Sequence, residues 1–131
     1  MSDELIACEA DAQALKGRSG LGRIFYATGY SLAGLKAAYV GEAAFRQLLL
    51  LNLILIPIAC LLDVSGSERA ILIMVAILAL IVELLNSAIE AAIDRISLAI
   101  HPLSKCAKDM GSAAQFLALT LIAIVWGVVL L

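Results

Sequence analysis

The stretch that covers residues 110–131 contains no charged side chain, and it restricts the possible folds more than any other part of the sequence. It is long enough for a membrane span, which needs roughly 20 predominantly apolar residues. A second apolar run, residues 70–82, is unbroken. Apolar residues make up 63% of the chain, against roughly 45–50% in soluble domains. A soluble fold of 131 residues buries too little surface to hide them. We therefore expect an all-α integral membrane protein.

Three transmembrane helices follow from the positions of the apolar segments. We expect spans over 43–62, 69–94 and 110–131, connected by polar segments at 63–68 and 95–109. The first span is the least regular, because an asparagine and a proline interrupt it and its strictly apolar part is short for a bilayer.

The part of the chain before the first span falls into two pieces. We expect residues 1–22 to be an N-terminal extension and residues 23–131 to form the membrane domain. The extension begins with a short acidic helix, ends in a glycine-rich breaker, and lacks the apolar core of a cleavable signal peptide. Residues 23–42 mix aromatic, apolar and charged side chains. This mixture favours an amphipathic helix on the membrane surface over an ordinary soluble helix.

The basic residues predict how the chain is oriented in the membrane. Eight of the nine lysines and arginines lie before the first span, at its N-terminal end, or between the second and the third span, and only Arg69 lies on the other side. Cytoplasmic segments carry the excess of basic residues. The N-terminus and the connection 95–109 are therefore predicted to face the cytoplasm, where ATP is found, and the C-terminus to face outward.

Composition and motifs exclude several classes of protein. A net charge of −2 gives no basic surface for nucleic acid. The three cysteines lie far apart in the sequence, which argues against a disulfide framework or a zinc site. The glycine-rich segment 17–23 lacks the spacing of a Walker A motif, and no protein-kinase motif set is present. Any nucleotide site must therefore be of another kind.

Polar side chains recur along the second predicted span at helical spacing. One face of a helix would carry Glu83, Asn86, Glu90 and Asp94. A carboxylate at membrane depth costs about 2.5–3.5 kcal/mol on insertion scales, so it marks a functional site by default. The alternative is a polar stripe that joins helices through hydrogen bonds. Asn86 and Ser87 alone would serve that purpose, whereas the three acids make it less attractive.

The residue types in this stripe suit phosphoryl transfer. Carboxylate oxygens bind Mg²⁺ together with phosphate oxygens, and a buried carboxylate is suited to general-base catalysis. Glu42, at the start of the first span, is expected at a similar depth and is a candidate to complete the metal site. Lys105 and Lys108 offer positive charge to phosphates. Together these are the parts of a phosphoryl-transfer site.

Four stretches of the sequence match a known family. They are A-x-G-Y-S-x-x-G-L-K-A-A-Y-x-x-E-A-A-F-R-Q at 27–47, C-L-L-D-V at 60–64, V-E-L-L-N-S-A-I-E-A-A-I-D-R-I-S at 82–97 and A-K-D-M-G-S-A-A at 107–114. On these motifs the chain resembles the prokaryotic diacylglycerol kinase family. The resemblance covers most of residues 23–114, and the pairing of the last two motifs is highly specific.

The resemblance implies an enzyme that moves the γ-phosphate of ATP to the 3-hydroxyl of diacylglycerol, giving phosphatidic acid. Members are homotrimers in the bacterial inner membrane, with three spans and a surface helix in each chain. Neighbouring subunits share active sites at the cytoplasmic interface. Diacylglycerol, ATP, Mg²⁺ and the lipid bilayer are therefore the expected substrates, cofactor and surroundings.

The resemblance also assigns roles to individual residues. It implies Glu83 as the catalytic base, Asn86 as a further active-site residue, and Glu42 and Glu90 as metal ligands. The implied nucleotide contacts are Arg23, Tyr30, Glu42, Glu90, Ala99, Ile100, His101, Lys108 and Asp109. The implied lipid contacts are Arg23, Ala27, Thr28, Gly29, Tyr30, Ser31, Leu32, Lys36, Ala37, Ala38, Tyr39, Ala44, Phe45, Arg46, Gln47, Leu48, Arg69, Glu83 and Ser112.

Three residues depart from the family's usual pattern, and three other interpretations stay open. Leu32 and Leu48 bear on the fit of the lipid, and Lys105 bears on phosphate contact. An undecaprenol kinase of the same superfamily would share the carboxylates and differ in the lipid. An ion-translocating membrane subunit would account for Glu83 but not for Glu42. A structural protein would tolerate the replacement of both Glu83 and Glu90 by glutamine.

Overall fold

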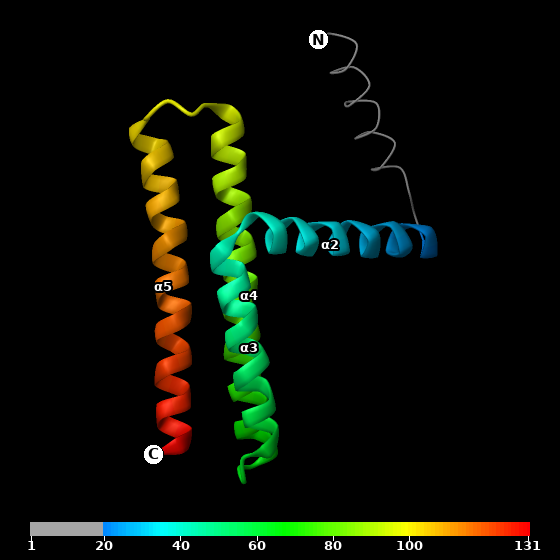
Figure 1. Ribbon diagram of the computed structural model, residues 1–131, viewed down its shortest axis with the longest axis vertical. Helices are drawn as coiled ribbons and strands as arrows, with labels where there is room; N and C mark the ends of the chain where they lie inside the picture. The colour runs from blue at the N-terminus through cyan, green and yellow to red at the C-terminus, as the bar shows by residue number, and fades with distance from the viewer. Residues whose placement is uncertain (1–19) are drawn as a thin grey trace. The chain divides into compact units, whose positions relative to one another are not determined.

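The computed structural model describes residues 20–131, and this part of the chain is helical apart from short turns (Figure 1). It contains the helices α2 (Leu21–Gly41), α3 (Ala43–Leu61), α4 (Gly66–Ile96) and α5 (Pro102–Leu130). The predicted all-α fold is confirmed for these residues. The acidic helix predicted near the N-terminus, and most of the predicted extension 1–22, lie outside the described residues.

Three of the helices are long and apolar enough to cross a membrane, as the sequence predicted. They are α3, α4 and α5, whose most apolar windows have mean hydropathies of 2.0, 2.5 and 2.3. The 31 residues of α4 give it a length of about 46 Å, well beyond the roughly 30 Å of the hydrocarbon layer. One or both ends of α4 therefore extend past the hydrocarbon.

The N-terminal part of α2 belongs to a compact unit that ends at Ala37, and residues 38–131 form the other unit. Within the first unit, two hydroxyl groups bond back to the carbonyl oxygens four residues earlier, Thr28 Oγ1 to Ile24 and Ser31 Oγ to Ala27. The side chains of residues 21–37 are all exposed in the isolated chain, and this fits a helix that contacts lipid. Its location on a membrane surface remains a prediction.

The second unit is a bundle in which α4 packs against both α3 and α5, and α4 and α5 run antiparallel (Figure 1). Its core contains many small residues along α4, and Leu72, Ala76 and Ala79 are fully buried. Small residues let helix backbones approach closely, which is how membrane helices gain packing energy without a hydrophobic driving force. The core is therefore centred on the apolar part of α4.

The turn between α3 and α4 is fixed by side chains at both helix ends. Ser65 and Glu68 form a capping box, with Ser65 N donating to Glu68 Oε2 at 2.8 Å and Glu68 N donating to Ser65 Oγ at 3.2 Å. The guanidinium group of Arg69 donates to the carbonyl oxygens of Ala59 and Leu62 at 3.1 and 3.0 Å. Free donors and acceptors at these helix ends thus find partners within the turn.

The second connection is shorter than the sequence indicated. We expected a polar connection over 95–109, but α4 continues to Ile96 and α5 begins at Pro102. Proline is well suited to the first position of a helix. The Nδ1 atom of His101 accepts from the backbone N–H of Leu103 at 3.1 Å, so His101 is the N-cap. Of the charged residues of this segment, Lys105, Lys108 and Asp109 therefore project from the first turns of α5, whereas Arg95 lies in the last turn of α4.

Candidate active site

A polar groove of about 400 Å³ lies where α4, α5 and the start of α3 meet. The groove is lined by Glu42, Ala44, Glu83, Asn86, Glu90, Ser112, Gln115, Phe116 and Leu119. The groove therefore contains Glu42, Glu83 and Glu90, three of the four acids that the sequence pattern indicated. Glu42 is about 40 residues away from the other two along the chain.

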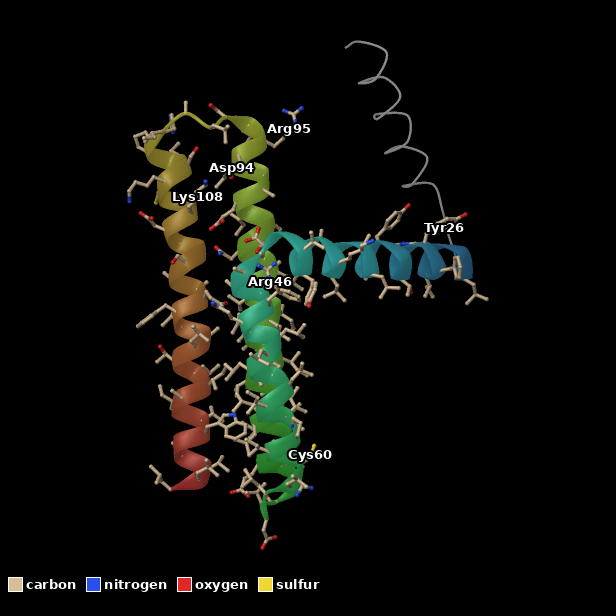
Figure 2. The ribbon with its side chains drawn as sticks, in the orientation of Figure 1. Tyr26, Arg46, Cys60, Asp94, Arg95 and Lys108 are labelled. Atoms are coloured by element: carbon tan, nitrogen blue, oxygen red, sulfur yellow. The ribbon has the colours of Figure 1, made fainter. Side chains whose placement is uncertain are left out.

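Glu42 reaches the groove because the helix breaks at this residue. Its backbone is extended, with φ −114° and ψ 112°, between the end of α2 and the start of α3. The guanidinium group of Arg46 donates to the carbonyl oxygens of Tyr39 and Val40 at 2.8 and 3.1 Å (Figure 2). These bonds satisfy carbonyls that the break leaves open, so Arg46 stabilises the bend that carries Glu42.

Glu83 is the most buried acid of the groove, with 4% of its surface exposed. The ion pairs within residues 20–131 are Lys105–Asp109 and Lys108–Asp94, so no basic side chain of this part pairs with Glu83. A buried carboxylate without a partner is costly unless it takes up a proton or faces a cation. Stability therefore does not explain why this carboxylate is buried.

Asn86 connects the acids of the groove to α5. Its Nδ2 atom donates to Glu90 Oε1 at 3.4 Å, while its Oδ1 atom is buried and has no hydrogen-bond partner. On the facing helix, a methyl group added to Gly111 would collide with Asn86 Oδ1. Glycine thus allows α5 to approach α4 at this point. In the sequence, Gly111 stands out only as part of the motif at 107–114.

A second cavity, of about 370 Å³, lies at the connection between α4 and α5. Five of the residues that line it are among the expected nucleotide contacts: Ala99, Ile100, His101, Lys108 and Asp109. The ammonium group of Lys108 bonds Asp94 Oδ1 at 2.6 Å across the two helices (Figure 2). Asp94, the last acid of the stripe, therefore holds a lysine at the edge of this cavity.

Other expected site residues lie elsewhere in the structure. Arg69 is part of the turn between α3 and α4, at the opposite end of α4 from Glu90. Phe45 is a buried side chain of α3, Leu48 is buried on the same helix and borders a smaller apolar groove beside the polar one, and Ala38 is buried near the end of α2. Arg23, Tyr30 and the residues from Ala27 to Ala37 belong to the N-terminal unit, so their contact with a substrate stays a prediction.

The groove has the oxygen ligands that Mg²⁺ prefers. Among residues 20–131, no three acidic, histidine or cysteine side chains are close enough to hold a metal ion on their own. Mg²⁺, however, is usually held by one or two carboxylates together with water and substrate phosphates. The carboxylates of Glu42 and Glu90 and the unpartnered Oδ1 atom of Asn86 fit that pattern.

One polar residue of the groove was missed from the sequence. Gln115 lies on α5 and contributes to the polar groove and to a neighbouring apolar one. Nothing in the sequence motifs separates this glutamine from a surface residue of the third span. A polar residue inside a long apolar stretch was the only signal available.

Comparison with known proteins supports the family that the sequence motifs indicated. The model of the family described as prokaryotic diacylglycerol kinase matches residues 29–130. A diacylglycerol kinase of Pseudomonas aeruginosa is 70% identical over 116 residues, which cover 88% of this chain and 94% of the relative. The diacylglycerol kinase of Escherichia coli K12 is 50% identical over 112 residues, covering 86% and 92%. One from Helicobacter pylori is 45% identical over 108 residues, covering 82% and 84%. The chain belongs to the prokaryotic diacylglycerol kinase family.

Proposed function

We propose that this chain transfers the γ-phosphate of ATP to the 3-hydroxyl of diacylglycerol and so produces phosphatidic acid. The observation that carries this proposal is the groove that Glu42, Glu83 and Glu90 all line. Phosphoryl transfer depends on positioning and on charge neutralisation rather than on covalent chemistry by the protein. A groove rich in oxygen ligands beside long apolar helices offers both to a lipid acceptor.

Glu83 acts as the general base in this proposal. Its carboxylate takes the proton of the lipid hydroxyl as the hydroxyl oxygen bonds to the γ-phosphorus and the bond to the departing ADP breaks. The burial of Glu83 supports this role, since a lipid alcohol enters from the side through apolar surroundings. Such a carboxylate is less hydrated than one in water.

Glu42 and Glu90 hold Mg²⁺ together with the phosphates of ATP. When bound, the ion neutralises phosphate charge and aligns the donor. Asn86 orients Glu90 through the hydrogen bond from Nδ2, in the way that neighbouring groups commonly fix metal ligands. The three residues therefore act as one unit, with Glu83 about two helical turns deeper than Glu90.

The connection between α4 and α5 receives the nucleotide. Its cavity is bordered by Lys108, which offers positive charge to phosphate oxygens. The family resemblance adds Arg23 and Tyr30 as nucleotide contacts. It gives the lipid contacts as Arg23, residues 27–32, 36–39 and 44–48, Arg69, Glu83 and Ser112. In this arrangement the polar groove joins a soluble donor to an apolar acceptor.

The chain works as a homotrimer in the bacterial inner membrane, with active sites shared between neighbouring subunits. The bias of basic residues supports an N-terminus in the cytoplasm and a C-terminus in the periplasm. Large apolar side chains such as Leu53, Met74 and Phe116 are strongly exposed on the three long helices of the single chain. They need lipid or neighbouring subunits to cover them.

The proposal is tested by transfer of radiolabelled phosphate from ATP to lipid in mixed micelles. We expect label in diacylglycerol, little label in undecaprenol, and no transfer without Mg²⁺. Glu42→Gln and Glu90→Gln should raise the Mg²⁺ concentration needed for half-maximal activity by about 10–100-fold. Preferential labelling of undecaprenol would make the chain a kinase of the other lipid. Labelling of no lipid alcohol would overturn the proposal.

A further inference from the structure

Gln115 lies where two grooves of different character join. The polar groove also contains Glu42, Asn86 and Glu90, whereas the neighbouring apolar groove, of about 270 Å³, has mainly apolar walls. Both grooves are bordered by Ala44, Glu83, Gln115 and Leu119. Among these four shared residues, Glu83 and Gln115 are the two with polar side chains. A ligand that occupies both grooves must therefore pass these two groups.

The side-chain amide of Gln115 has no hydrogen-bond partner within the described part of the chain. Both Nε2 and Oε1 are buried and unpaired, and the residue lies in the span that contains no charged side chain. An unpaired buried amide is costly, so buried polar groups are generally satisfied by protein, water or ligand. The terminal torsion of glutamine is broad, so the amide can turn toward a ligand without backbone movement.

The two grooves together match the anatomy of an acylated glycerol. The acceptor hydroxyl belongs in the polar groove against Glu83, and the acyl chains belong along Leu48 and Leu51 in the apolar groove. The ester groups then come at the junction between them. An ester carbonyl is a hydrogen-bond acceptor, and the primary amide of glutamine is a donor of two N–H groups.

We propose that Gln115 is a specificity-determining residue, whose Nε2 atom donates a hydrogen bond to an ester carbonyl of the lipid acceptor. This inference rests on the proposed function of the groove. It gives the enzyme a reason to prefer an acceptor with a carbonyl close to its hydroxyl. A polyprenol has no such carbonyl and would leave the amide unpaired, and sites built around a hydrogen bond reject ligands that lack it.

The test compares two acceptors that differ only in the carbonyls, dioleoylglycerol and the dioleyl ether of glycerol, with wild type and Gln115→Met. Methionine keeps the length of the side chain and removes the amide. Wild type should show kcat/KM roughly tenfold higher for the ester than for the ether, as expected for one lost hydrogen bond. Gln115→Met should lose roughly that factor on the ester only, with the KM for ATP unchanged. Thr120→Val, one turn further along α5, is the matched control and should keep the wild-type preference.

The outcomes separate this inference from the proposed function. No phosphorylation of either lipid by wild type overturns the proposed function. Active wild type with equal kcat/KM for ester and ether overturns only the role of Gln115, whether or not the variant folds. An equal loss on both acceptors in Gln115→Met, accompanied by a lower Tm in detergent, identifies Gln115 as a structural contact between helices and also overturns its role. An unchanged or higher Tm with loss on the ester alone supports it.

Discussion

The two halves of α4 serve different purposes. From Ala70 to Val82 the helix presents mainly small and branched apolar side chains, and Leu72, Ala76 and Ala79 are completely buried in the bundle. From Glu83 onward the same helix carries acids and an amide. This end of α4 borders the polar groove and the cavity at the connection between α4 and α5. The first half is well packed, whereas the second half contains polar groups whose burial destabilises the folded protein. Under the proposed function, chemistry and stability are separated along one helix, as expected where polar groups are kept for chemistry.

The strongest test of this contrast is Glu83→Gln. We expect phosphate transfer to fall about a thousandfold, because general-base catalysis contributes roughly 10²–10⁴. The thermal midpoint in detergent should stay the same or rise, because an unpaired buried charge disappears. Radiolabel transfer and thermal unfolding on the same preparation check both. Near-normal activity would remove the proposed base from the mechanism.

The apolar half should respond in the opposite way, and Leu72→Ala tests it. Leu72 is fully buried, and truncating such a side chain typically costs 2–5 kcal/mol, so we expect a loss of about 2 kcal/mol or more. The KM for ATP of the protein that remains folded should not change. Leu85→Ala is the control, since Leu85 is on the same helix and is 60% exposed. A changed KM for ATP in Leu72→Ala would contradict the separation of the two halves.

Gly111→Ala tests the contact between the second half of α4 and α5. The added methyl group meets Asn86 Oδ1, so Asn86 must move away from Glu90 or the helices must separate. We expect activity to fall about tenfold, with a cost of about 1–3 kcal/mol in stability. Gly127→Ala on the same helix is a close control, because nothing lies within 4 Å of the added group. Equal behaviour of the two variants would show that the approach at Gly111 is unimportant.

The smallest effects are expected at the outer end of the functional half. The Lys105–Asp109 pair is open to solvent, with side-chain exposures of 70% and 63%, and exposed pairs contribute about 0–1 kcal/mol. Lys105→Met should therefore leave both stability and activity nearly unchanged. Lys108→Met, which removes the bond to Asp94, should raise the KM for ATP several-fold. Steady-state kinetics at varied ATP would distinguish the two lysines, and a larger effect of Lys105→Met would reverse their roles.

Helix periodicity made much of the candidate site predictable. The face shared by Glu83, Asn86 and Glu90 follows from steps of three, four and seven residues. Periodicity does not extend beyond one helix, so it gave no information on what faces this stripe. It therefore did not identify Gly111 as the close contact of Asn86 or Gln115 as a neighbour of Glu83 in both grooves. Periodicity also did not show that α5 begins within the polar segment 95–109, because that start depends locally on a proline and a histidine cap.

The sequence by itself determined the number of membrane helices and the acidic face of α4, because both depend on side-chain chemistry repeated along one continuous segment. It also supported the family through short motifs. The tertiary structure alone decided how α5 lies against α4 and how the break at Glu42 brings a third carboxylate into the groove. Such contacts depend on the approach and register of separate helices. Many sequences with the same periodicity satisfy those conditions differently.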